Sequence, residues 1–154
     1  DEEGKIALVR KLEQYGRVYV SAEGDVPEAL KPNLLQTPYE LVHHVLAFAK
    51  LVYSDGATMA SEAAVLGTHA LYVNTIVSGS TREQQNRFHL LCCCNNEGPA
   101  RYEKATAQAI EWLETPNLRE LGKEKQQKLL AEKVDINGYY MVEMDRLAKA
   151  GRKG

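Results

Sequence analysis

The segment that most constrains the fold is residues 51–67, where a short apolar stretch gives way to a turn and then to an alanine-rich helix. Leu51, Val52 and Tyr53 favour a strand. A helix that begins just past a strand end directs unpaired N–H groups, and the positive end of its dipole, at one point. That arrangement favours binding of an anion such as phosphate. The segment therefore predicts an α/β fold with a candidate phosphate site at residues 54–58.

The turn residues suit this chemistry. Gly56 and Ala57 leave room for a ligand to approach the backbone, and Thr58 can cap the helix or add a hydroxyl donor. Ser54 and Asp55 begin the same turn. One turn further on, Glu62 shares a helix face with Thr58. A carboxylate there is placed to accept hydrogen bonds from a ribose diol.

A purely structural interpretation of the same segment stays open. Ala60, Ala63, Ala64 and Gly67 form a stripe of small residues that would let the helix lie close on a sheet. The loop also has fewer glycines than a phosphate-loop or dinucleotide fingerprint. The spacing alone fits both ligand binding and close packing.

Composition narrows the class of protein. The chain has 154 residues and a formal net charge of −2, which gives no reason to expect nucleic acid or an anionic membrane as a partner. No apolar run approaches the length of a membrane span. The three cysteines are adjacent, at Cys92–Cys94, so they cannot supply several corners of one metal site, and a disulfide between neighbours would be strained. We expect buried thiols in a reducing cytoplasm.

Helical and extended patterns alternate along the chain, with no linker, so residues 1–154 are expected to form one domain. Thr37 reads as a helix N-cap and Pro38 as the first helical residue. Ser80 and Glu83 read as a capping box, and Gly138 as a helix break. The expected helices are 5–15, 38–49, 57–67, 80–88, 100–114, 117–132 and 137–149, and the expected strands are 17–20, 51–53, 70–73 and 90–94, with a loop over 21–33.

This alternation predicts a Rossmann-like parallel sheet with helices on both faces. Such a domain normally opens with a strand, whereas this chain opens on a charged helix. We therefore expect a fragment that lacks the first strand and everything before it. The apolar side chains of Tyr139, Tyr140, Met141 and Met144 then either form an exposed contact for the missing part or pack in the core.

Several polar residues are further candidates. His43 and His44 precede the motif strand, and one of them is placed to donate to a phosphate or to transfer a proton; a structural histidine is the alternative. Asp55 either caps the next helix, the favoured interpretation, or contacts ligand. The others follow the first and third expected strands at the sheet edge where ligands of open α/β sheets bind, with solvated surface side chains as the alternative: Glu23, Asn74, Ser78, Arg82 and Arg87.

Residues 54–68 resemble the donor-binding motif in the C-terminal half of GT-B-fold proteins, which include UDP-N-acetylglucosamine 2-epimerases and the N-acetylglucosaminyltransferase of peptidoglycan synthesis. The chain is most similar to a family of GT-B-like predicted glycosyltransferases of unknown function. That family carries Asp-Gly-x-Thr-Met-x-x-Glu-Ala-Ala-x-Leu-Gly, matched here from Asp55 to Gly67. Residues 37–49 are similar to its histidine-containing helix.

The resemblance implies roles for the matched residues. The backbone of Gly56, Ala57 and Thr58 would face the diphosphate of a nucleotide-sugar, and Glu62 would hold the ribose hydroxyls. It also implies an N-terminal partner domain with the acceptor site and usually a catalytic base. The chain departs from the pattern at Thr68-His69, where relatives often carry a proline.

The function expected from these residues is binding of a nucleotide-sugar, a UDP-sugar first, as half of a glycosyltransferase-like protein that is not catalytic alone. No cofactor and no metal is expected, as the resemblance implies. The catalytic residues stay unassigned, and whether the whole protein is an enzyme stays open. The alternatives are half of a sugar-nucleotide epimerase and a non-catalytic α/β binding or assembly module.

Overall fold

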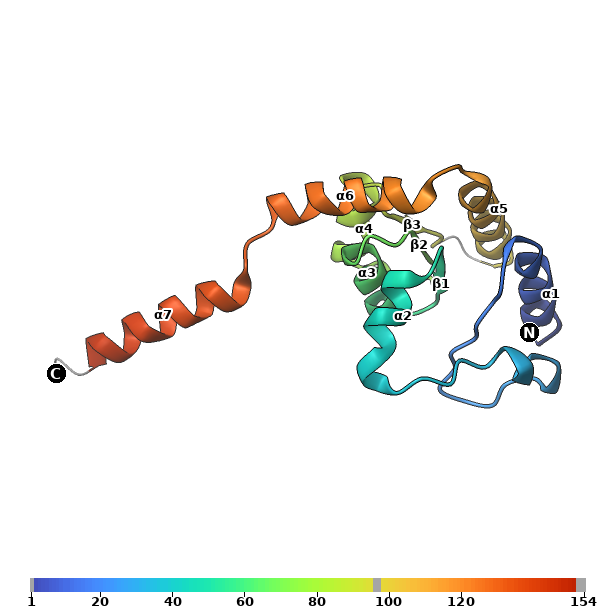
Figure 1. Ribbon diagram of the computed structural model, residues 1–154, viewed down its shortest axis with the longest axis horizontal. Helices are drawn as coiled ribbons and strands as arrows, with labels where there is room; N and C mark the ends of the chain where they lie inside the picture. Colours follow the sequence, from blue (N-terminus) through green and yellow to red (C-terminus); the bar gives the residue numbers. More distant parts are fainter. Residues whose placement is uncertain (1, 96–97, 152–154) are drawn as a thin grey trace.

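The centre of the protein is a three-stranded parallel sheet with strand order β1-β2-β3. The computed structural model describes residues 2–95 and 98–151. The strands are β1 (Val52–Ser54), β2 (Ala70–Tyr72) and β3 (Leu91–Cys93), and in the register Tyr53 pairs with Leu71 and Leu71 with Cys92. Figure 1 shows helices on both sides of this sheet. The predicted Rossmann-like α/β class is confirmed.

One face of the sheet carries the helices that connect the strands. Helix α3 (Ala57–Val65) joins β1 to β2, and α4 (Gly79–Asn86) joins β2 to β3. Helices α2 (Val42–Phe48) and α6 (Leu118–Glu132) pack on the same side. Ala60, Ala63 and Ala64 are fully buried there, so the small-residue stripe does bring α3 close to the sheet.

The opposite face is covered mainly by α5 (Ala100–Glu114), whose observed bounds equal the predicted ones. Ala105 and Ala109 of this helix pack on Leu71 and Val73 in a second core cluster. Leu12, the last residue of α1 (Glu2–Leu12), reaches the same cluster. The sheet is therefore buried on both faces, as parallel sheets usually are.

Helix α6 approaches the end of α3 with no space between backbones. A Cβ built on Gly122 would lie 2.2 Å from the carbonyl oxygen of Gly67, and Gly67 itself has φ +82°. Both positions therefore require glycine, one for close approach and one for a left-handed backbone conformation. This contact fixes how α6 crosses the sheet.

The N-terminal part differs from the prediction. Residues 17–20 form no strand, and only Val20 pairs with Leu34, in an isolated parallel bridge. The predicted loop contains a 3-10 helix, η2 (Glu28–Asn33), and another, η1 (Glu13–Tyr15), follows α1. The Asn33 side chain donates to Glu13 Oε1 at 2.8 Å and to the carbonyl of Val18 at 3.1 Å. The bond to Glu13 holds the segment against η1, just after α1, instead of in the sheet.

Three predictions from local motifs were also wrong: the helix start at Thr37-Pro38, the Ser80–Glu83 capping box and the break at Gly138. Pro38 precedes a 3-10 helix, η3 (Tyr39–Leu41), and α2 begins only after it. The capping box is absent, because the N-cap of α4 is Ser78 and no side chain caps that helix. Glu83 instead forms ion pairs with Arg87 and Lys133. The last break falls at residues 133–135, so Gly138 lies inside α7 (Ile136–Gly151).

Helix α7 projects away from the body of the molecule in Figure 1. Its apolar side chains are exposed, which excludes core packing in this chain; they are Ile136, Tyr139, Tyr140, Met141, Val142, Met144 and Leu147. Over the described part of the chain, no helix combines the length and apolar character that crossing a membrane would require.

Candidate functional site

The turn between β1 and α3 is built by Ser54. Its hydroxyl accepts a hydrogen bond from the Gly56 amide at 3.0 Å and donates to the Gly56 carbonyl at 3.2 Å. Gly56 is the N-cap of α3, in an extended conformation. Ser54 therefore shapes the turn, and the Gly56 amide already has a partner within the protein.

The amides that follow are differently placed. The first bond of α3 runs from the Ala60 amide to the Gly56 carbonyl, so the amides of Ala57, Thr58 and Met59 precede any helical acceptor. No side chain caps this helix. The favoured capping role for Asp55 is therefore wrong, and Asp55 lies exposed in the turn.

Helix α4 repeats the pattern beside α3. Its N-cap is Ser78, its first bond runs from the Arg82 amide to the Ser78 carbonyl, and no side chain caps it. The two helices contact one another. Two uncapped helix starts are thus neighbours, and each presents amides and the positive end of a helix dipole.

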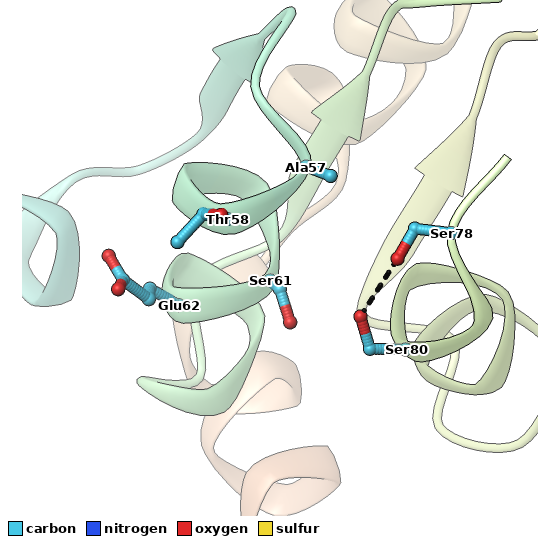
Figure 2. A pocket seen from close by; sticks show the side chains of 6 residues that line it. All are labelled: Ala57, Thr58, Ser61, Glu62, Ser78 and Ser80. Atoms are coloured by element: carbon cyan, nitrogen blue, oxygen red, sulfur yellow. Dashed lines mark hydrogen bonds between the residues drawn. The ribbon is translucent and has the colours of Figure 1, made fainter. Parts of the chain in front are cut away.

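A pocket of about 230 Å³ lies at these helix starts. Figure 2 shows the hydroxyls of Ser61, Ser78 and Ser80 facing the space between α3 and α4, with Ser78 Oγ and Ser80 Oγ 3.0 Å apart. Hydroxyls and backbone amides are good donors to phosphate oxygens. The residues that line the pocket are Ala57, Thr58, Ser61, Glu62, Ser78 and Ser80.

Glu62 contributes to the rim of this pocket. Figure 2 shows its carboxylate on the side of α3 away from Ser78 and Ser80. That carboxylate lies 3.4 Å from Nε2 of His43; the His43 side chain is exposed and the Glu62 side chain is partly exposed. His43 therefore lies beside Glu62, but neither His43 nor His44 lines the pocket, and both histidines are exposed.

The loop after β2 is tied to the motif turn. Asn74 donates from its side-chain amide to the carbonyl of Asp55 at 2.9 Å, and its Oδ1 accepts from the amide of Ile76 at 3.2 Å. Asn95 in turn donates to the carbonyls of Asn74 and Ile76, at 2.7 and 3.1 Å. Asn74 therefore lies beside the turn as the sheet edge predicted, but its side chain joins two loops.

The remaining candidates lie outside the pocket lining. Arg82 and Glu23 are exposed and do not line it. Arg87 pairs with Glu83 and Glu132 at the other end of α4. Ser61 and Ser80 are the residues that the sequence did not identify as ligand donors. Ser61 follows Thr58 by one helical turn, which was its only signal.

The Thr68-His69 pair has structural roles. Thr68 is buried, and its hydroxyl donates to the carbonyl of Leu46 at 2.7 Å, which ties α2 to the end of α3. His69 is 2 % exposed, with Nε2 2.9 Å from Nζ of Lys125. Burial, and then the Lys125 charge, lower the pKa of His69 to about 4. Thr68 and His69 therefore take part in packing and hydrogen bonding away from the pocket.

Within the described ranges, no group of three or more His, Cys, Asp or Glu side chains is placed to hold a metal ion. The site is thus defined by two helix starts, serine hydroxyls and Glu62 at the rim. No protein-family model matches the chain, and no curated protein and no solved structure gives a match.

Proposed function

We propose that the pocket at the starts of α3 and α4 binds the diphosphate of a nucleotide-sugar, and that the chain is the nucleotide-sugar-binding half of a glycosyltransferase-like protein. The observation that carries the proposal is the convergence of two uncapped helix starts on one hydroxyl-lined pocket. Free amides, hydroxyls and aligned dipoles are the groups that recognise phosphate oxygens.

The size of the pocket limits what it holds. About 230 Å³ is below the usual volume of a site that encloses a drug-sized ligand. In the proposal only the diphosphate occupies the pocket, and the nucleoside and sugar extend over its rim. Glu62 lies on that rim with its carboxylate turned toward His43, on the side of α3 away from Ser78 and Ser80. In the proposal the ribose lies over that side of α3, and the carboxylate turns from His43 to accept from the ribose hydroxyls.

Nucleotide titration tests the proposal. Calorimetry with UDP, GDP, UDP-N-acetylglucosamine and inorganic pyrophosphate should give saturable binding. Ser80→Asp should lower the affinity for every one of these ligands by at least about tenfold, because a carboxylate in the pocket repels phosphate. The variant should stay folded, since an acidic residue suits the first turn of a helix. Ser21→Asp, at an exposed loop position, is the matched control and should leave binding unchanged.

Glu62→Ala separates the two parts of the ligand. It should lower the affinity for nucleotide-sugars and nucleotides about tenfold, because charge-assisted hydrogen bonds are lost. The affinity for pyrophosphate should stay the same. Glu124→Ala, on the exposed side of α6, is the control. Absence of any response to these ligands, or an equal response of both serine variants, would refute the proposal.

An assembly module is the second candidate function. The observation in its favour is α7, whose apolar side chains remain exposed, Met141 and Val142 to 70 % and 71 %. Large exposed apolar surfaces commonly mark interaction sites. This function predicts no nucleotide response, so the same titrations distinguish the two candidates.

A further inference from the structure

The three adjacent cysteines are divided between the two faces of the sheet. Successive side chains of a strand point to opposite faces. Cys93 accordingly belongs to the core cluster under α3 and α4, whereas Cys92 and Cys94 belong to the cluster under α5. On that side the sulfurs of Cys92 and Cys94 are 3.9 Å apart.

The two paired thiols differ in environment. Cys92 is partly exposed, and Cys94 is fully buried. The hydrogen bond from Cys94 lowers the pKa of the Cys92 thiol; Lys104 lowers it further, while burial and Glu111 oppose the shift. The same hydrogen bond and burial raise the pKa of Cys94. Of the two thiols, Cys92 is thus the one that ionises more readily to the reactive thiolate, and Cys94 is placed to donate to it.

We propose that Cys92 and Cys94 form a redox-active dithiol that a hydroperoxide oxidises to an intramolecular disulfide. The Cys92 thiolate attacks the terminal peroxide oxygen, the O–O bond breaks, and one water or alcohol leaves as Cys92 becomes a sulfenic acid. Cys94 then attacks that sulfur, the S–O bond breaks, and a second water leaves. In sum the two thiols lose two protons and two electrons, and these reduce the peroxide to water and an alcohol or a second water.

The backbone allows this bond at the edge of the usual geometry. Residues two apart on a strand are about 6.4–6.8 Å apart, the upper end of the Cα separation that disulfides span. The sulfurs must close from 3.9 Å to about 2.05 Å. Cys94 lies just beyond the end of β3, but its amide still donates to the carbonyl of Tyr72 at 2.8 Å, so the disulfide bond requires a local shift of the backbone. A disulfide so constrained is readily reduced.

Thiol counting on the full chain tests the proposal. After hydrogen peroxide treatment, unfolding and alkylation, the wild-type chain should retain one of its three alkylatable thiols. Its intact mass should fall by two hydrogens, and dithiothreitol should restore all thiols. Cys93→Ser should behave likewise and lose both remaining thiols. In that variant Cys92 and Cys94 are the only possible intramolecular pair.

Cys94→Ser should form no intramolecular disulfide, and its Cys92 sulfenic acid should be trapped by dimedone. Circular dichroism checks that this variant is folded; if it is not, the Cys93→Ser result decides alone. Three results would overturn the proposal: no disulfide in Cys93→Ser, a two-hydrogen loss in folded Cys94→Ser, or loss of thiols only through disulfide-linked dimers.

Discussion

Replacing Gly122 by alanine is expected to lower the free energy of unfolding by about 3 kcal/mol, the upper part of the usual cost of overpacking. The new Cβ would lie 2.2 Å from the carbonyl oxygen of Gly67. That atom is backbone held by its own φ of +82°, so it cannot rotate away as a side chain would. Helix α6 would have to move off the sheet, which urea denaturation should detect.

Gly79→Ala is the matched control. Gly79 is the first residue of α4, and no atom lies within 4 Å of a Cβ built on it. Alanine there should be neutral or slightly stabilising, because it reduces the freedom of the unfolded chain. If Gly122→Ala were as stable as Gly79→Ala, the close crossing of α6 over Gly67 would be wrong.

Acid should destabilise the protein by about 3 kcal/mol through His69 alone. Burial first, and the Lys125 charge second, lower the pKa of His69 from 6.5 to about 4 in the folded state. Between these values the unfolded chain binds the extra proton, so stability is full above pH 6.5 and is lost as pH falls to about 4. The difference in pKa sets the magnitude.

The measurement is the slope of the free energy of unfolding against pH between 4 and 6.5, compared with the His69→Asn variant. His69→Asn lowers overall stability but should remove most of the slope. His44→Asn, at an exposed position on α2, should keep the wild-type slope. A wild-type slope in His69→Asn would show that another group causes the acid sensitivity.

The elements predicted correctly from the sequence are those whose local residue patterns favour the same structure as their contacts in the fold. Helix α5 matches its expected bounds because its alanines and its flanking Pro99 and Thr115 give the same signal as its contacts. The strand expected over 17–20 failed for the opposite reason. Its β-forming residues have no neighbouring strand to pair with, so only Val20 forms a bridge.

The candidate site was predictable only where its residues belong to one local sequence pattern. The turn at 54–58 and Glu62 follow from one continuous segment, and the structure places several of these residues at the pocket. Ser61 and Ser80 join it only because α3 and α4 pack side by side, which no local pattern specifies. The hydrogen bond from the Gly56 amide to the Ser54 hydroxyl likewise depends on the turn geometry, which the sequence pattern does not specify.

The outward direction of α7 affects how the molecule scatters and diffuses. A chain of 154 residues collapsed into one globule has a radius of gyration of about 15 Å. With the last helix extended away from the sheet, as in Figure 1, small-angle scattering should give a larger radius and a skewed tail in the distance distribution. Docking of α7 onto the rest of this chain would shorten that tail, so the scattering curve distinguishes an extended last helix from one that folds back on the sheet domain.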